Sequence, residues 1–84
     1  MSFHLIYTRR AVKDIQKLEQ NVKSRIGKAL LRYVTDPLKY SKRLTNPTLG
    51  TFRFRIGDHR VVFDLEGEKI VVLRVGHRSD IYKG

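Results

Sequence analysis

The chain has no cysteine and no long apolar run, and both absences narrow what it can be. Without cysteine it can form neither disulfides nor thiolate metal sites, and its three histidines lack the spacing of zinc ligands. No apolar stretch approaches the ~20 residues that a membrane-spanning helix needs. The N-terminus lacks the apolar core of a signal peptide, because Arg9 and Arg10 follow only a short strand-like run. We therefore expect a cytoplasmic protein without a metal or other cofactor.

Acidic residues are also scarce. Eight Asp and Glu stand against 18 Lys and Arg, which gives 84 residues a net charge of +10 and a pI near 10.4. Such a field favours nucleic acid or an acidic surface as the partner over a neutral small substrate. The alternative is a basic protein whose charge is spread over solvated helix surfaces. A chain of this length predicts one domain, residues 1–84, with a small core that a protein partner would help to stabilise.

Hydrophobic periodicity predicts the element order β-α-α-β-β-β. A strand at 3–7 is followed by a helix that Thr8 caps and a second helix that Asn21 caps and Pro37 ends. Three more strands are predicted at about 51–56, 59–65 and 69–76, with turns at 57–58 and 66–67.

We expect this order to give an α+β fold, with a four-stranded antiparallel sheet and a helical hairpin packed on one face. The strand at 51–56 should run antiparallel to the first strand, because two helices separate them. Residues 36–50, with Pro37, Pro47 and Gly50, form a long connection of the kind that often carries function. Gly27, in the middle of the second helix, is expected to allow close approach of the two helices.

Strand alternation predicts a sheet face rich in arginine. In residues 51–56, Phe52, Phe54 and Ile56 point one way while Arg53 and Arg55 point the other. The arginines that alternation puts on this outer face are Arg53, Arg55, Arg60 and Arg74. Clustered guanidinium groups repel one another unless an anion lies among them, and their planar donors match phosphate.

In the last strand, alternation places Val71, Leu73 and Val75 together on the core side, opposite Arg74. On the outer face, Val62 and Val72 are expected to leave apolar area between the arginines. A partly acidic, amphipathic partner segment would cover that area.

The C-terminal residues His77, Arg78 and Tyr82 suit phosphodiester chemistry. Arginine stabilises charge on the phosphate, histidine can move a proton, and tyrosine can stack on a base. His77 has an alternative role as a hydrogen-bonded residue at a strand end, and Tyr82 as a packing aromatic. Arg9 and Arg10 lie in the first turn of the first helix, where the helix dipole disfavours cations, so they are either RNA contacts or solvated charges.

Two segments, FRFRIGDHRVVF at 52–63 and RVGHRSDIY at 74–82, resemble the RelE branch of the RelE/ParE toxins. With the element order, the resemblance extends over nearly the whole chain. It implies the toxin of a toxin–antitoxin pair that enters the ribosomal A site and cleaves messenger RNA there. In such toxins the ribose 2′-hydroxyl attacks the adjacent phosphate without a metal, and a cognate RelB-like antitoxin blocks the activity.

The resemblance also implies roles for individual residues. Arg60 corresponds to the arginine that stabilises the transition-state phosphate, and Arg78 to the arginine near the leaving oxygen. Tyr82 corresponds to the tyrosine that stacks on or orients the cleaved nucleotide. Arg53 and Arg55 stand where related toxins carry basic residues, often lysine, one of which is proposed as the general base.

Arginine, with a pKa of ~12.5 or above, cannot accept the 2′-hydroxyl proton. The base would then be His59, His77 or Asp58, or catalysis would depend on electrostatics and alignment by the ribosome. His77 is favoured, because some related toxins use a C-terminal histidine.

Two other functions are compatible with the sequence. One is a ParE-type toxin of the same fold that acts on DNA gyrase and would not need Arg60, Arg78 and Tyr82. The other is a non-catalytic nucleic-acid-binding module whose arginines grip only backbone phosphates. Salt-sensitive binding without cleavage would support the second alternative.

Overall fold

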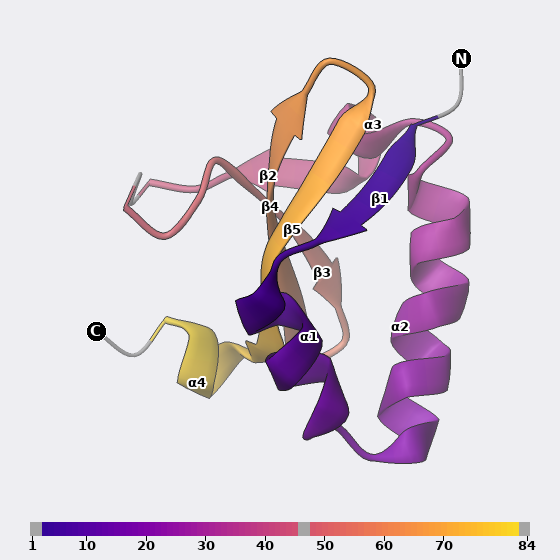
Figure 1. Ribbon diagram of the computed structural model, residues 1–84, viewed down its shortest axis with the longest axis vertical. Helices are drawn as coiled ribbons and strands as arrows, with labels where there is room; N and C mark the ends of the chain where they lie inside the picture. The colour runs from indigo at the N-terminus through magenta and orange to yellow at the C-terminus, as the bar shows by residue number, and fades with distance from the viewer. Residues whose placement is uncertain (1–2, 46–47, 83–84) are drawn as a thin grey trace.

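The computed structural model describes residues 3–45 and 48–82, which form an α+β fold around one five-stranded sheet (Figure 1). In chain order the elements are β1 (His4–Tyr7), α1 (Arg9–Gln16), α2 (Gln20–Tyr33), α3 (Pro37–Tyr40), β2 (Ser41–Arg43), β3 (Phe52–Ile56), β4 (His59–Glu66), β5 (Lys69–His77) and α4 (Arg78–Ile81). The predicted α+β fold class is confirmed, and the first strand, both long helices and the three C-terminal strands form as predicted. The expected four-stranded antiparallel sheet is wrong, because a fifth strand, β2, joins it and β1 pairs in parallel. Asn21 lies inside α2, whose N-cap is Glu19, and Pro37 begins α3. No helix in the described part of the chain is long and apolar enough to cross a membrane.

The sheet has the strand order β1-β5-β4-β3-β2, in which β1 pairs with β5 in parallel and the other neighbours are antiparallel. β3 therefore runs in the same direction as β1, and the expected antiparallel relation between them is wrong. The reason lies in residues 36–50, which contain α3 and the short strand β2. β2 takes the antiparallel place, and the chain reverses once more before β3. Pro47 lies outside the described residues.

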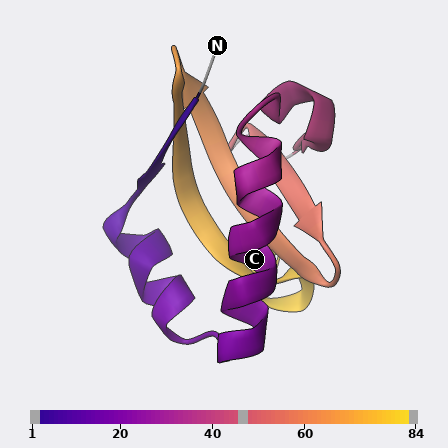
Figure 2. The same cartoon turned by 90° about the vertical axis from the view of Figure 1, so that its right-hand side faces the viewer.

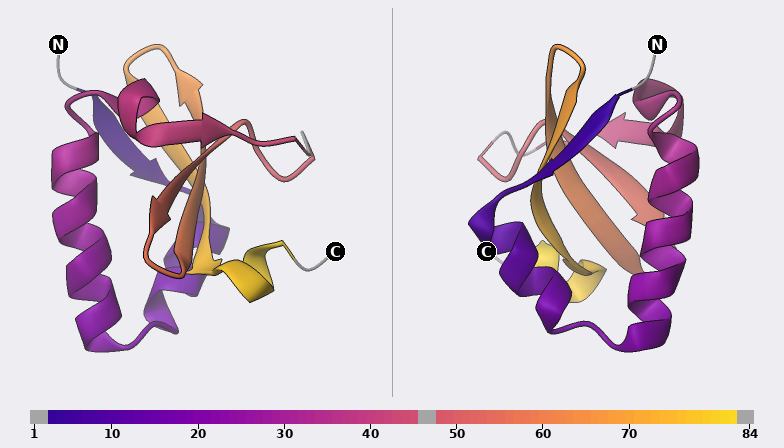
Figure 3. Two further views of the ribbon diagram at one scale, coloured as in Figure 1. Left: turned by 180° about the vertical axis from the view of Figure 1, so that it is seen from behind. Right: turned by 45° about the vertical axis from the view of Figure 1, so that its right-hand side comes forward.

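The two long helices cover one face and one edge of the sheet. α2 lies across the inner face, while α1 continues from β1 beside the C-terminal half of β5 (Figures 2 and 3). Tyr33 of α2 contacts Phe54, with ring centroids 5.0 Å apart, and Phe54 stacks on Phe63 at 4.3 Å. Thr8 caps α1 as predicted, because its Oγ accepts a hydrogen bond from the Ala11 N–H at 3.2 Å.

A β-bulge in β5 changes which of its side chains face the core. Val62 of β4 is opposite Arg74, whereas Phe63 is opposite Val72, so Leu73 is the inserted residue. One inserted residue reverses the alternation of faces beyond it. The side chains of β5 that the structure buries are Ile70, Val72 and Val75. Of the core positions predicted on this strand, only Val75 is correct.

Candidate functional site

The sheet face that points away from α2, here called the outer face, carries two rows of residues in register. Arg53 of β3 is opposite Val62, which is opposite Arg74 of β5. One pair further along, Arg55 is opposite Arg60. The backbone register therefore places the four arginines on one face, as alternation predicts, although the bulge is needed to bring Arg74 there.

Arg60 differs from its neighbours because it is buried, with 6% of its surface exposed, whereas Arg55 is exposed. Its Nη1 donates hydrogen bonds of 2.9 Å to the carbonyl oxygens of Gly57 and His59. A guanidinium can be buried only when its donors are satisfied, and here the β3–β4 turn supplies the acceptors. Arg60 thus holds the turn in addition to facing the outer side of the sheet.

Arg74 is held by an acidic residue that sequence analysis missed. Its Nε donates to Oδ2 of Asp14 at 2.7 Å, and the same oxygen accepts the Val75 N–H at 3.0 Å. Arg10 lies one helical turn before Asp14, with its Nε 3.7 Å from Oδ1. Asp14 is the only acidic residue of α1, and this is the one signal in the sequence that could have identified it.

The contact with Asp14 occurs where β1 stops covering the edge of β5. The β1 pairing ends at Tyr7, opposite Val72, and the Thr8 N–H then donates to the Val72 carbonyl at 3.1 Å. The Thr8 hydroxyl donates to the Leu73 carbonyl at 3.3 Å. Beyond this point, side chains of α1 rather than a strand satisfy the edge of β5.

The middle of the outer face is covered by the chain itself. A Cβ on Gly50 would lie 2.5 Å from Cγ1 of Val62 and 3.1 Å from Cδ1 of Leu73, so the backbone there packs directly on both side chains. The Thr51 N–H donates to Oδ1 of Asp64 at 2.8 Å and fixes this segment to β4. Val62 is fully buried in consequence.

The expected apolar area on the outer face is therefore wrong at both of its positions. Val62 lies under the segment that precedes β3, and Val72 belongs to the main core because of the bulge. The covering segment and α4 project on the same side of the sheet and flank the outer face (Figure 3).

α4 folds back onto the outer face at the end of β5. The Arg78 N–H donates to the Asp58 carbonyl at 2.8 Å, which ties α4 to the same β3–β4 turn that Arg60 holds. Ile81 is buried against Gly76, where an added Cβ would meet its Cδ1 at 3.2 Å. Tyr82 follows with 45% of its surface exposed. Arg78 and Tyr82 are thus both exposed at the end of the arginine rows.

His77 caps α4, and its ring is oriented by Ser79. Nδ1 accepts the Ser79 N–H at 3.1 Å and lies 2.8 Å from the serine Oγ. In the neutral ring this assigns the proton to Nε2. The partly buried His59 is opposite His77 in the sheet, and the two rings meet edge to face with centroids 5.5 Å apart.

Burial lowers the pKa of His59 below its ordinary value of 6.5, and the nearby His77, Arg25 and Arg60 lower it as well. Asp58 acts in the opposite direction. The His59 ring is therefore mainly neutral around pH 7, with one ring nitrogen unprotonated. Among the described residues, no group of three or more His, Asp or Glu side chains is arranged to hold a metal ion.

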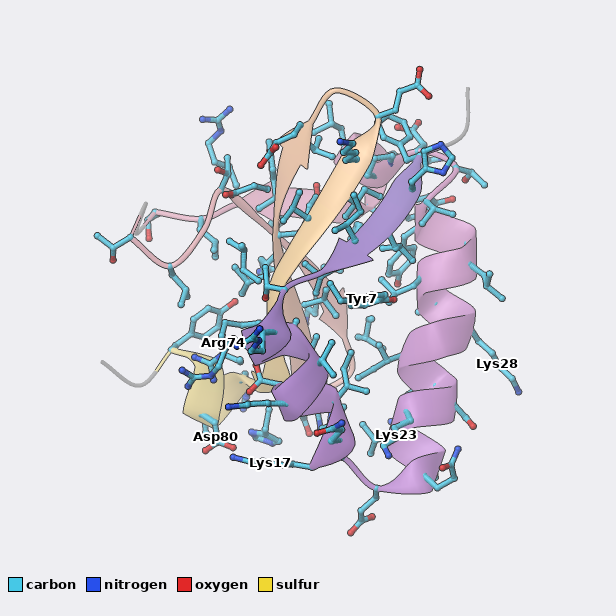
Figure 4. All side chains as sticks on the ribbon, viewed as in Figure 1. Tyr7, Lys17, Lys23, Lys28, Arg74 and Asp80 are labelled. Carbon is cyan, nitrogen blue, oxygen red and sulfur yellow. The ribbon has the colours of Figure 1, made fainter. Side chains whose placement is uncertain are left out.

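A cleft of about 560 Å³ opens between α1, the end of β5 and α4. Its polar lining includes Arg10, Lys17, His59, Arg74, His77 and Asp80. Lys17, Arg74 and Asp80 all line the cleft and lie in the same region of the molecule, around α1 and α4 (Figure 4). The predicted RNA-binding residues are therefore divided between two areas, because Arg53 and Arg55 lie on β3 while Arg10 and Arg74 line the cleft. Arg9 is exposed at the start of α1 and does not line the cleft.

Comparison with known proteins gives consistent matches over nearly the whole chain. The family model described as the ParE toxin of the type II toxin–antitoxin system parDE matches residues 5–82. Toxin RelG of Mycobacterium tuberculosis is 30% identical over 86 residues, which cover 99% of each protein.

Solved structures give the same result at the level of the fold. The toxin–antitoxin complex RelBE2 of Mycobacterium tuberculosis contains a chain with a TM-score of 0.83 and 26% identity, and the match covers 93% of this chain and 100% of that one. The intact RelBE complex of E. coli matches with a TM-score of 0.75 at 22% identity, covering 90% of this chain and 96% of that one. A free-state mutant of the E. coli toxin RelE matches with a TM-score of 0.76 at 22% identity, covering 98% and 92%.

Proposed function

The chain belongs to the RelE/ParE family of type II toxin–antitoxin toxins, and from this premise we propose that it is a ribosome-dependent endoribonuclease. In this proposal it acts in the cytoplasm, enters the ribosomal A site and cleaves messenger RNA there. The ribose 2′-hydroxyl attacks the adjacent phosphate without a metal, leaving a cyclic phosphate and a free 5′-hydroxyl. A cognate RelB-like antitoxin blocks the activity.

The observation that carries this proposal is the attachment of two arginines to one turn. Arg60 donates to the carbonyls of Gly57 and His59, and the backbone of Arg78 donates to Asp58 between them. The guanidinium of Arg60 and the backbone of Arg78 are thus both held at the β3–β4 turn, and the Arg78 side chain is exposed beside it. A phosphate bound beside this turn would meet the fixed charge of Arg60, and the Arg78 side chain could reach the negative charge that develops in the transition state.

The two histidines next to this turn are the proposed candidates for the general base. The Nδ1 lone pair of His77 is engaged by Ser79, so His77 would have to release Ser79 before it could accept a proton. His59 is held neutral by its lowered pKa and has no such engagement among the described contacts. Parallel His59→Ala and His77→Ala variants, assayed from pH 6 to pH 8, test the assignment. A variant that keeps the parental rate across this range removes its histidine from the mechanism.

Ribosome dependence is tested by primer extension on the same transcript with and without translation. We expect cuts only on the translated transcript, because alignment of the 2′-hydroxyl with the phosphate is left to the ribosome. Equal cutting of both transcripts would contradict the proposal.

A second candidate function is favoured by one specific observation, the match to a ParE toxin model. A ParE-type toxin would inhibit DNA gyrase, and Arg78→Ala should then leave its inhibition of supercoiling unchanged. A third candidate is a nucleic-acid-binding module, which would bind RNA with a steep salt dependence but leave it intact in translating extracts. Supercoiling and primer-extension assays on one preparation separate the three functions.

A further inference from the structure

We propose that the cleft between α1, the end of β5 and α4 binds a phosphodiester group of an RNA strand, with Arg74 as the main ligand and Asp14 as the residue that orients it. This deepens the proposed function, on which the choice of RNA as the ligand rests. The cleft adjoins the proposed cleavage centre, because Gly76 lines the cleft and is opposite Arg60 in the sheet.

The guanidinium of Arg74 is fixed at one of its three nitrogens. Asp14 holds it through Nε at 2.7 Å, and within the described residues no other partner occupies its two terminal nitrogens. A quarter of the Arg74 side chain is exposed, against 11% of Asp14. A guanidinium that is held at Nε keeps its terminal N–H donors in one fixed plane. Little side-chain entropy is therefore lost when these donors bind two phosphate oxygens.

The other groups at the cleft are mainly donors. Arg10 and Lys17 lie four residues before and three residues after Asp14, on the same side of α1. His77 also lines the cleft, and in the neutral ring its proton is on Nε2, because Nδ1 accepts the Ser79 N–H. Asp14 is already engaged by Arg74 and by the Val75 N–H, so its carboxylate does not oppose an anion as a free one would.

Glu19 and Asp80, which also line the cleft, are both exposed, so water screens their repulsion of an anion. The net charge of +10 supplies long-range attraction for a polyanion. A phosphodiester is the anion that this arrangement fits, since it presents two oxygens to the fork and belongs to a charged chain.

The fold leaves the cleft open because β1 ends before β5 does. β1 covers the edge of β5 only as far as Val72, and α1 then leaves the sheet at an angle (Figure 1). The cleft is lined by residues 74–77, which belong to the part of β5 that β1 does not cover. Thr8 and Asp14 satisfy the backbone of β5 there, so the edge needs no further strand and the space beside it stays accessible.

Binding is tested without ribosomes, on a short single-stranded RNA that carries 2′-O-methyl groups throughout and cannot be cleaved. Fluorescence anisotropy at several salt concentrations measures its affinity for the folded protein. Arg74→Gln should weaken binding by at least about fivefold and reduce the salt slope by about one unit. Lys69→Gln is the matched control, because it removes one exposed cation at the other end of the same strand. Equal effects of the two variants would overturn the proposal.

Asp14→Asn separates orientation from net charge. The variant makes the protein more positive, so charge alone predicts tighter binding, whereas loss of orientation predicts weaker binding by about threefold or more. An asparagine oxygen can still accept the Val75 N–H, which keeps the support of β5. Tighter binding overturns the role of Asp14. If Asp14→Asn does not fold, Arg74→Lys replaces it, because this change keeps the positive charge but removes the planar guanidinium. Unchanged RNA affinity of Arg74→Lys would then overturn the role of orientation.

Two further measurements distinguish an RNA phosphodiester from free inorganic phosphate as the ligand, and RNA binding at the cleft from RNA cleavage. Inorganic phosphate, titrated against the ¹⁵N-labelled protein, should shift the Arg74 Nε–H signal only at concentrations far above those of the RNA. Phosphate binding without Arg74-dependent RNA binding would overturn the proposal. A protein that fails to cleave on ribosomes but binds RNA through Arg74 would refute the proposed endoribonuclease and support this subsite.

Discussion

The two halves of β5 are built in different ways. From Lys69 to Val72 the strand lies between β1 and β4, and its side chains alternate regularly between core and surface. Beyond the bulge at Leu73 it has β4 on one side only, and its other edge is satisfied by Thr8 and Asp14 of the α1 region. The first half is ordinary sheet, while the second carries Arg74 and His77 and leads into α4. Both halves contribute buried side chains, but only the half beyond the bulge also carries residues of the candidate site.

The largest expected effect tests the first half of β5, from Lys69 to Val72. Ile70→Ala should lower the free energy of unfolding by about 2–5 kcal/mol, because Ile70 is fully buried and its truncation leaves a cavity. Val71→Ala is the control at the adjacent position on the opposite face and should cost less than about 1 kcal/mol. Urea unfolding measures both. A larger loss for Val71 would mean that the bulge is misplaced.

The second half of β5 is tested through Arg78, the residue that directly follows the end of the strand. Arg78→Ala should lower the single-turnover rate of cleavage by at least about 100-fold, as expected when a group that stabilises the transition state is lost. Arg60→Ala should lower the rate similarly, but it should also lower the melting temperature, because Arg60 holds the β3–β4 turn. Ribosome binding by the two variants, measured by co-sedimentation, should weaken less than the rate. Collapsed ribosome affinity with a normal rate on saturated complexes would contradict these roles.

The segment that covers the bulge is tested by a pair of glycines. Gly50→Ala should lower the free energy of unfolding by about 1–3 kcal/mol, because its Cβ would collide with Val62 and its φ is +155°. Gly27→Ala is the matched change in α2, where a Cβ would meet nothing within 4 Å, and should raise stability by up to about 1 kcal/mol. The expected role of Gly27 in close helix packing is therefore wrong. Similar losses for both variants would show that Val62 is not covered by this segment.

The smallest effect concerns the histidine pair at the end of the second half. The folded-state pKa of His59 is lowered, so the unfolded chain binds a proton more readily. The stabilisation from neutral His59 should be complete above pH 6.5, the unfolded value, and decline as the pH falls towards the folded value. His59→Gln should flatten this part of the stability curve, measured by thermal unfolding from pH 5 to pH 8. An unchanged slope would contradict burial of the ring as the cause.

Much of the molecule is determined by local sequence pattern. Thr8 at the start of a helix, apolar spacing along α1 and α2, and alternation in β3 and β4 each depend on residues a few positions apart. The outer-face positions of Arg53, Arg55 and Arg60 could be predicted for the same reason, and the resemblance to the RelE toxins is also visible in the sequence. Turns at Gly57 and Gly67 follow from the positive φ that glycine adopts freely, +60° at both.

Tertiary structure decided the features that depend on contacts between distant segments. The parallel pairing of β1 with β5, the short strand β2 and the inserted residue Leu73 each require a partner that the local pattern does not contain. The same holds for Asp14, which is 60 residues from Arg74 in the chain and 2.7 Å from it in space. Sequence periodicity determines which face of an element is apolar, but the edge that a strand pairs with and the carboxylate that an arginine meets are chosen only when the whole sheet assembles.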